Sequence, residues 1–400
     1  MRGSWPTPTA AADAPNSSAL HARAAQTAYA CASGSAWGVV QRDEIAIGQS
    51  NACLAHGRGG WQPLLTELTE LYLLPPELQL GREDRHWWGA CDHDLRRENR
   101  TQMRPELKHE WIPEGEGCSA LRKGRERLPE IAQLACAFCT RRAGQSVLFV
   151  GDSVQGEMFL AFASILGVRS IHVNAGNTAC REVAPRGSGK TELDVTVELC
   201  GGSSAAPVRA RFIRNEMVVL DEASNERMRH KDHPRVGPAM MLCDWRSAAS
   251  AADLLVLNRG YHALHGNITA HSMQLNATFS ALDTIMGRDA LADRVIYRGT
   301  HASFHDCGRI RHDPIISLPW EKILNTLNGP WNAQYNWREI QPRELNARKV
   351  LDAWGVPYLD TFMSTAYRPF GGRMSRSNCN HFCLPGPVDD WVRLLLAHWT

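Results

Sequence analysis

The chain has 400 residues, a formal net charge of +2, 44% hydrophobic residues and 22% charged residues, a balance typical of a soluble globular protein. The small net charge and the lack of a dense Lys/Arg run argue against a nucleic-acid partner. No stretch reaches the ~18 apolar residues that span a bilayer. We therefore expect any membrane association to depend on a segment outside this sequence.

The first eighty residues differ in composition from the rest of the chain. Residues 1–30 are rich in Ala, Ser and Thr, with Asp13 as the only acidic residue, which is typical of a disordered leader or an organelle transit segment. Within residues 63–74 (PLLTELTELYLL), apolar side chains recur at three and four positions and predict a helix. Residues 87–118 are polar and aromatic and predict an irregular loop held by disulfides. We expect a partly disordered leader with one helix over 1–80, and one folded domain over 81–400.

The remaining chain alternates between short apolar runs and helical patterns. The run at 146–150 (SVLFV) is continuous, as in a strand buried on both faces of a parallel sheet. Residues 193–200 and 208–221 alternate in polarity and predict a hairpin across a Gly/Ser-rich turn. Further strands are predicted at 170–176, 252–260, 294–299 and 356–360, and helices at 157–167, 273–286, 339–354 and 389–399. This alternation predicts an α/β fold, a three-layer α/β/α parallel sheet with an irregular, disulfide-bearing N-terminal extension.

Polar residues follow several of the predicted strands. Ligands of open α/β sheets bind at the carboxyl ends of the strands. Ser153 follows the first strand and opens a helix, whose free N–H groups can hold a developing oxyanion. Asn258 and Asp360 follow later strands, and Asn258 could add a side-chain donor to the same oxyanion.

A serine nucleophile needs a base, and His381 is the candidate because it lies in a polar loop just before the last predicted helix. The alternative for Ser153 is a helix N-cap. The alternative for His381 is a surface or structural histidine. The residues taken one at a time leave both alternatives open.

Two motifs together resemble a known family. The sequences LFVGDS (148–153) and NCNHFCLPGPVDDWVRLL (378–395) resemble the signatures of the PC-esterase, or trichome birefringence-like, family. Its members are polysaccharide O-acetyltransferases and related acyl esterases with a fold similar to the SGNH/GDSL hydrolases. Weaker similarities lie at residues 109–118, 253–262, 295–305 and 358–372, so the resemblance covers roughly residues 87–400.

The resemblance implies roles for individual residues. Ser153 would be the nucleophile, His381 the general base, and position 378 the acid that orients the histidine. The catalytic candidates are completed by Gly151 and Asp152 of the G-D-S motif, and the candidates for oxyanion or substrate binding are Asn258, Gly260 and Arg298.

The sequence departs from the family pattern at two places. Gly156 and Glu157 stand where the family has an Arg-Asn pair, and Asn378 stands where it has Asp. Asparagine can orient an imidazole through its amide oxygen but supplies no negative charge, and an Asp-to-Asn change in serine proteases costs ~10⁴ in turnover. Asp360 and Asp389 are alternative carboxylates, although nothing in the sequence places either beside His381.

The function that the resemblance implies is O-acetyl transfer to a hydroxyl of a cell-wall or secretory polysaccharide through a Ser153 acyl-enzyme. The partner would be a glycan, with an acetyl donor as co-substrate, acetyl-CoA being one candidate, and with no bound cofactor or metal. One alternative is an acetyl esterase that uses the same residues. Another is a non-catalytic glycan-binding protein, which Asn378 favours.

Cysteine content bears on the compartment. Twelve cysteines and the sequons at Asn16, Asn99, Asn267 and Asn276 favour an oxidising lumen, and we expect the Golgi or secretory pathway. The C-x-x-C pair Cys136 and Cys139 predicts structural thiols or a local disulfide, with zinc shared with His301, His305 and Cys307 as the alternative. The family resemblance suggests Cys307 as partner of Cys379, and Cys91 as partner of Cys383.

Overall fold

A computed structural model gives the fold. It describes residues 59–63, 109–113, 127–173, 180–182, 194–201, 206–220, 241–262, 268–303, 339–362, 365, 380–382, 384 and 386–400. Residues 64–74 of the predicted helix, most of the predicted leader, and Asn378, Cys379 and Cys383 lie outside these residues, and Pro63 ends a strand.

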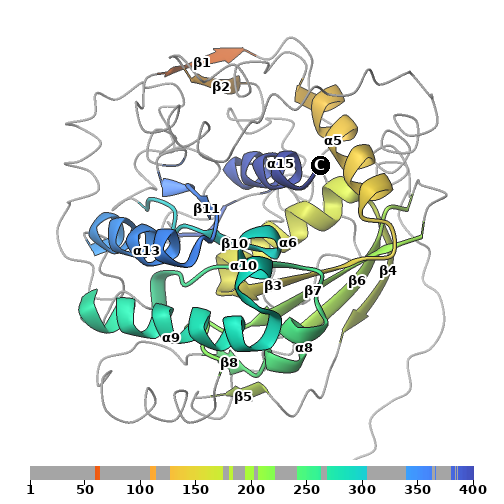
Figure 1. The fold of residues 1–400 in the computed structure, drawn as a ribbon. Coiled ribbons are helices and arrows are strands. Elements are labelled where there is room, and N and C mark those ends of the chain that lie inside the picture. The colour runs from red at the N-terminus through yellow and green to blue at the C-terminus, as the bar shows by residue number, and fades with distance from the viewer. Residues whose placement is uncertain are drawn as a thin grey trace, which may run out of the picture.

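A seven-stranded sheet forms the centre of the described structure (Figure 1). Neighbouring strands follow the order β11-β10-β9-β3-β7-β6-β4. In that order their bounds are Tyr358–Leu359, Val295–Arg298, Leu254–Leu257, Ser146–Gly151, Val208–Arg214, Asp194–Leu199 and Val168–Val173.

Five of these strands are parallel. β3 pairs in parallel with β7 and β9, and β10 pairs in parallel with β9 and β11. Counted along the chain, the five run in the order 2-1-3-4-5 across the sheet, which is a doubly wound topology. Its switch point, where ligands of such sheets bind, lies between the ends of β3 and β9.

The other two strands make the sheet mixed. β6 pairs antiparallel with β7, and β4 pairs antiparallel with β6. The hairpin predicted for residues 193–221 is confirmed, and the predicted parallel sheet is confirmed as a mostly parallel one. β6 and β7 are antiparallel because a short turn can join only antiparallel strands.

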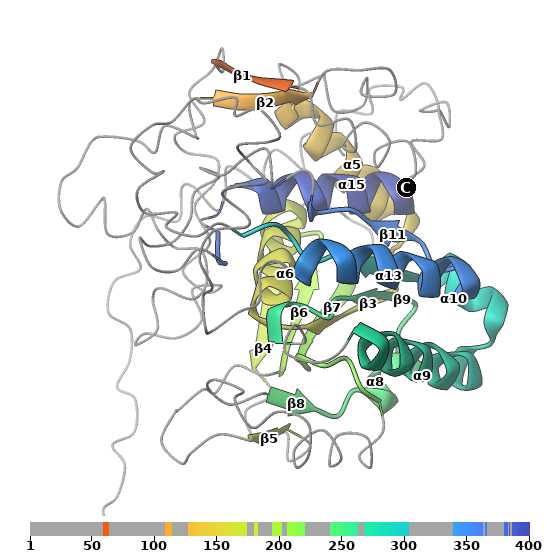
Figure 2. The same ribbon diagram turned by 90° about the vertical axis from the view of Figure 1, so that its left-hand side faces the viewer.

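Helices cover both faces of the sheet (Figures 1 and 2). On one face lie α5 (Arg127–Arg141), α6 (Ser153–Leu166) and α15 (Pro387–Trp399). On the other lie α8 (Arg246–Ala251), α9 (Ile268–Met286), α10 (Arg288–Arg294) and α13 (Ile340–Trp354). Among the described helices, none has the length and apolar character needed to cross a membrane.

The central strand explains why both faces are covered. Val147 and Phe149 of β3 belong to the apolar cluster under α6 and α15, whereas Leu148 and Val150 belong to the cluster under α9 and α13. Alternate side chains of a strand point to opposite faces, so a continuous apolar run must be buried twice. β3 therefore lies in the middle of the fold. The chain that follows it, at Asp152 and Ser153, is held in place because β3 packs against both apolar clusters.

The predicted elements are largely confirmed, with shifted ends. α6 ends before Gly167, whose φ of 76° is a backbone conformation that glycine adopts without strain. α9 begins at Ile268 rather than at residue 273, and the second hairpin strand ends at Arg214 rather than at residue 221. Sequence reasoning missed α8 and α10, which are six and seven residues long.

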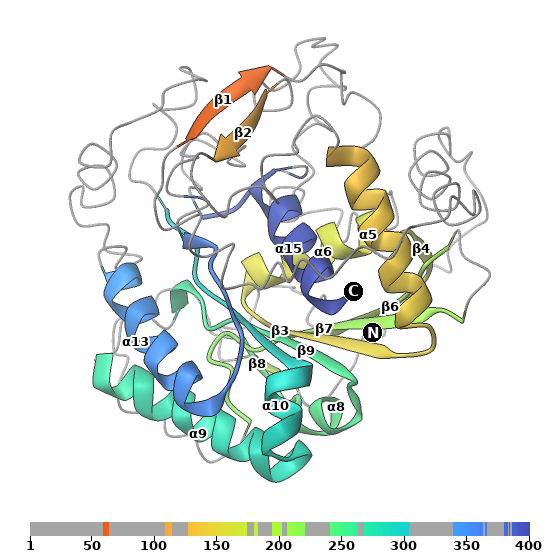
Figure 3. The same ribbon diagram turned by 45° about the horizontal axis from the view of Figure 1, so that its top comes forward.

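Two small antiparallel sheets lie apart from the central one. β1 (Gly59–Pro63) pairs with β2 (His109–Pro113), and β5 (Cys180–Glu182) pairs with β8 (Met241–Cys243). The β1–β2 pair lies on the α5 and α15 side of the molecule in all three views (Figure 3). It joins a segment of the predicted leader to the segment at 87–118, which was predicted to be irregular.

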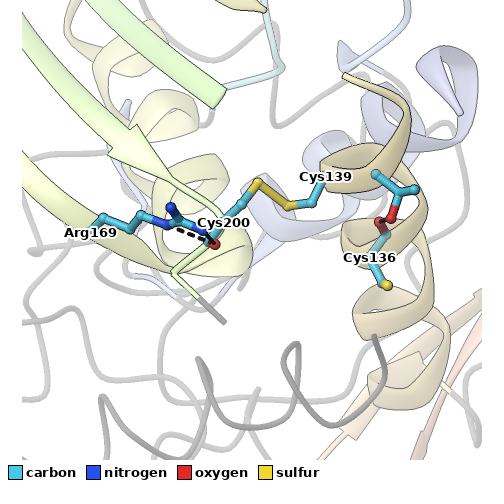
Figure 4. The surroundings of a disulfide bond; sticks show 5 residues. Cys136, Cys139, Arg169 and Cys200 are labelled. Atoms are coloured by element: carbon cyan, nitrogen blue, oxygen red, sulfur yellow. Dashed lines mark hydrogen bonds between the residues drawn. A yellow bond between two sulfur atoms is a disulfide. The ribbon is translucent and has the colours of Figure 1, made fainter. Parts of the chain in front are cut away.

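A disulfide links α5 to the end of β6 (Figure 4). Cys139 bonds to Cys200, 61 residues away, and the Cys200 carbonyl accepts hydrogen bonds from Arg169 Nε at 3.0 Å and Nη2 at 2.8 Å. The prediction of structural thiols or a local disulfide at Cys136 and Cys139 is therefore wrong. Cys136 and Cys243 are also disulfide-bonded, so the C-x-x-C pair has no thiolate to offer zinc.

Candidate active site

Ser153 is held at the junction of β3 and α6. Asp152 is the N-cap of α6, with extended backbone angles, and its Oδ1 accepts hydrogen bonds from Val154 N at 3.0 Å and Gln155 N at 3.2 Å. The Asp152 carbonyl accepts from Gly156 N at 3.1 Å. Since Asp152 provides the cap, Ser153 is the first residue of the helix and not its N-cap. Within the first turn of α6, this arrangement leaves the amide of Ser153 itself for an incoming oxyanion.

His381 reaches Ser153 across 228 residues of sequence. Its Nε2 lies 2.7 Å from Ser153 Oγ, and the two residues are 4% and 5% exposed. The expected proximity of these side chains is confirmed. With the ring proton on Nδ1, Nε2 accepts the hydroxyl proton of Ser153, which is the geometry that general-base activation requires.

The segment around His381 is anchored on its N-terminal side by residues that follow β10. His301 Nε2 lies 2.8 Å from the carbonyl oxygen of Asn380, and Ser303 Oγ donates to Asn380 Oδ1 at 2.8 Å. The His301 carbonyl in turn accepts from Tyr261 Oη at 2.7 Å. These bonds fix the residue before the candidate base.

On the C-terminal side, α6 and an aromatic cluster hold Phe382. The amide of Phe382 donates to Glu157 Oε2 at 3.2 Å. The Phe382 ring packs edge-on against Trp391 of α15, with ring centroids 5.5 Å apart, and lies 4.8 Å from the His301 ring. His381 is therefore flanked on both sides by hydrogen-bonded, buried neighbours, which limits displacement of a group whose position matters for catalysis.

Asn258 lies at the end of β9, on the other side of the switch point. It is fully buried, and its Nδ2 donates to the carbonyl of Arg298 at 2.8 Å, while Oδ1 has no hydrogen-bond partner. An amide nitrogen carries two N–H groups. One is used by Arg298, so the predicted oxyanion role would fall to the second.

Gly151 and Gly260 allow the turn after β3 to approach the chain after β9. A Cβ on Gly151 would lie 2.7 Å from Gln155 Cβ and 2.9 Å from the Asn258 carbonyl oxygen. A Cβ on Gly260 would overlap the carboxylate of Asp152. Both glycines thus serve close packing, and the structure gives Asp152 a capping role; direct catalytic or ligand-binding roles for them stay predictions.

Arg298 ties β10 to the start of α6. Its Nε donates to Gln155 Oε1 at 2.8 Å, and its Nη2 lies 3.8 Å from Asp152 Oδ1. The guanidinium lies 5.2 Å from the ring centroid of Trp391. Burial lowers the pKa of Arg298, while the nearby Asp152 and Glu344 oppose that shift. Arg298 was predicted to bind substrate, but it is buried and contacts the first turn of α6, the helix that begins with Ser153.

The two alternative carboxylates have structural partners. Asp360 forms an ion pair with Arg348 and accepts from Phe362 N at 2.9 Å. Asp389 accepts from Gly386 N at 2.7 Å and caps α15. The orienting role expected at position 378 falls outside the described residues.

Sequence reasoning missed the supporting residues Gln155, Glu157, His301 and Ser303. Glu157 alone carried a sequence signal, since it lies four positions after Ser153 and so shares its helix face. The contacts of His301 and Ser303 join segments about 80 residues apart, and no local pattern indicates them. Among the described residues, no group of three or more His, Cys, Asp or Glu side chains is placed to hold a metal ion.

Comparison of the chain with protein-family models, curated proteins and solved structures found no match. The class of the protein is defined here by its own fold and site. It is a doubly wound α/β protein with a buried Ser-His pair at the end of its central strand.

Proposed function

We propose that the protein is an acyl-transferring enzyme in which Ser153 is the nucleophile and His381 the general base. The observation that carries this proposal is the 2.7 Å contact between Ser153 Oγ and His381 Nε2. The contact lies at the end of the central strand, where doubly wound sheets bind ligands. Purely structural serines of this kind bond to their own helix amides, but here Asp152 takes that role.

The proposed reaction has two displacements. As Ser153 Oγ attacks the carbonyl carbon of an acetyl donor, its proton passes to His381 Nε2. Collapse of the tetrahedral intermediate expels the leaving group of the donor, which takes that proton, and leaves acetyl-Ser153. An acceptor hydroxyl then gives its proton to His381 and attacks the acetyl carbon, which forms the product ester and releases Ser153 Oγ to recover the proton.

The oxyanion of both intermediates would be bound by the amide of Ser153 and by the second N–H of Asn258. Such preorganised donors contribute most when they need no reorientation. Asn258 is fully buried and fixed by Arg298, which supports this assignment. Gly260, two residues further on, keeps the chain close to Asp152 and so to the nucleophile.

We further propose that the acceptor is a hydroxyl of a cell-wall or secretory polysaccharide and that the donor is a small activated acetyl compound such as acetyl-CoA. The support is the resemblance of residues 148–153 and 378–395 to the trichome birefringence-like, SGNH-related acyltransferases. An oxidising compartment such as the Golgi lumen agrees with the Cys139–Cys200 bond and the bonded state of Cys136 and Cys243.

A fluorophosphonate probe tests the nucleophile. We expect it to label the folded wild-type chain at Ser153, and to label neither Ser153→Ala nor His381→Ala above background. Absence of labelling in folded wild-type protein would reject the enzyme and favour the glycan-binding alternative, which the asparagine at position 378 supports.

Acceptor dependence separates transferase from esterase. Acetate release from an activated acetyl ester is measured with and without added polysaccharides, together with acetyl incorporation into the glycan. For a transferase, we expect acetyl groups to be incorporated into the added polysaccharide and acetate release to fall correspondingly. Release that no glycan alters would assign the protein as an esterase with the same residues.

A further inference from the structure

Glu157 lies one helical turn after Ser153 and is fully buried. Residues four apart in a helix have Cβ atoms about 5–6 Å from each other and lie on the same face. The Glu157 side chain therefore extends from α6 on the side where Ser153 meets His381.

The Glu157 carboxylate bonds to the residue that follows the candidate base. Its Oε2 accepts from Phe382 N at 3.2 Å, while His381 Nε2 contacts Ser153 on the same helix. Helix α6 thus holds the His381 segment at two points one turn apart, a hydroxyl at the ring and a carboxylate at the backbone. This geometry places a buried acidic group against the backbone of the residue next to the candidate base.

A carboxylate near an imidazole has an electrostatic effect in addition to its hydrogen bond. An opposite charge within about 4–6 Å favours the protonated ring, and low dielectric strengthens the attraction. Proton transfer from Ser153 creates an imidazolium, so such a charge would stabilise the transition state. At position 378 this chain has an asparagine, which supplies no charge.

We propose that Glu157 is a positioning residue that anchors the His381 segment and supplies the negative charge that stabilises the His381 imidazolium. Its catalytic consequence rests on the proposed acyl-transfer function, whereas its effect on protonation of His381 does not. Glu157 acts through His381 and makes no contact with substrate in this proposal.

Other charged groups lie on the elements around His381. They are Asp152 at the α6 cap, Arg298 and His301 at and after β10, and Asp389, Asp390 and Arg393 on α15. The test therefore compares variants in which all of these are unchanged.

The first measurement is an NMR titration of the His381 ring in the full chain, with its signal assigned by its loss in His381→Ala. Glu157→Gln keeps an oxygen acceptor for Phe382 N but removes the charge. We expect it to lower the titration midpoint of His381 by about one pH unit. Glu344→Gln, the same change of a buried carboxylate on α13, should leave the midpoint unchanged. An unchanged midpoint in folded Glu157→Gln overturns the proposal.

Glu157→Met provides a second variant in case the glutamine variant does not fold. It removes the charge with a side chain of similar length, so the titration midpoint of His381 should again fall by about one pH unit. An unchanged midpoint in folded Glu157→Met would indicate a purely structural role and overturn the charge assignment.

The second measurement is the rate of fluorophosphonate labelling as a function of pH. In Glu157→Gln the acidic limb of the profile should move to lower pH by the same amount as the NMR midpoint, with a reduced plateau. A merely structural role would lower the rate at every pH and leave the limb in place. If even the wild type is not labelled, the proposed function fails, and the NMR titration still decides whether Glu157 acts on His381.

Discussion

The asparagine at position 378 stands where the family resemblance places the orienting acid, and its replacement by aspartate should raise turnover. A carboxylate would accept the Nδ1 proton of His381 and stabilise the imidazolium, whereas asparagine can do only the first. A gain of ~1.4 kcal/mol would appear as about a tenfold increase in rate. The measurement is turnover of an activated acetyl ester by wild type and Asn378→Asp, with Ser153→Ala as the blank.

The same experiment is repeated in the Glu157→Gln background. Because Glu157 supplies a negative charge in the wild type, the gain in turnover from Asn378→Asp should be larger in Glu157→Gln than in the wild type. Equal gains in both backgrounds would show that the two positions act independently. Wild type and Asn378→Asp both at the level of the blank would remove the enzyme hypothesis.

Glu344 predicts a pH dependence of stability. It is buried on α13, where its Oε2 accepts from Tyr358 Oη at 2.8 Å, and burial raises its pKa above the ordinary value of 4.5. The folded state therefore holds the proton more tightly than the unfolded state, so this residue's contribution to stability falls as pH rises through and above 4.5.

Urea unfolding of wild type and Glu344→Gln between pH 4 and pH 8 measures this effect. We expect the free energy of unfolding of the glutamine variant to rise relative to wild type as pH increases, because glutamine does not titrate. A difference that is constant with pH would mean that Glu344 titrates alike in both states.

Individual residues differed in how far sequence could place them. Ser153 and His381 were predictable because each lies in a motif with a chemical meaning. Arg298 was predicted to bind substrate. Its side chain is instead fully buried and donates hydrogen bonds to Gln155 and to the Gly299 carbonyl. Sequence patterns report a residue's chemistry, whereas its partners depend on which elements pack beside it.

At the scale of elements, the approach of the β9–α9 connection to the start of α6 depends on Gly260. Asp152 Oδ1 caps α6, and Asp152 Oδ2 accepts from Tyr261 N at 3.3 Å. A methyl group at position 260 would overlap this carboxylate. We expect Gly260→Ala to lower the free energy of unfolding by on the order of 1–3 kcal/mol and to reduce labelling of Ser153, because the cap must shift.

Gly201→Ala is the matched control. Its Cβ would lie 3.4 Å from the Val168 carbonyl oxygen, an ordinary contact, so stability should change little. Urea unfolding and labelling of both variants give the comparison. Equal effects of the two substitutions would show that the approach at Gly260 is not what holds the α6 cap.

Local patterns predicted the strands of the seven-stranded sheet, including both edge strands, but not where each strand begins and ends. Long apolar runs and clear helix periods indicated β3, α6, β9 and α13. β11 has two residues and β10 four, so their bounds depend on pairing with neighbours. Short helices such as α8 form because the connection packs against α9 and β3, and not because of a strong local signal.

For the molecule as a whole, the Cys139–Cys200 disulfide joins the first described helix to the antiparallel end of the sheet. Closing a loop of this span stabilises by about 4 kcal/mol in the chain-entropy model. We expect the double variant Cys139→Ala, Cys200→Ala to lose stability of that order, measured by urea unfolding without reductant. If the free energy of unfolding falls by less than about 0.5 kcal/mol, packing alone holds α5 against the antiparallel strands, and the disulfide contributes little.

The sequence by itself determined the α/β class, the central strand, the helix that follows it and the chemistry of Ser153 and His381. These follow from local patterns, since burial on two faces requires a continuous apolar strand and a helix needs a period of 3.6. Only the tertiary structure decided how closely Ser153 and His381 approach, that Glu157 and His301 hold the histidine segment, and that the predicted hairpin joins the parallel strands in one mixed sheet. The reason is physical: contacts between distant segments form through the packing of whole helices and strands on two cores, a property of the assembled chain that no short stretch carries.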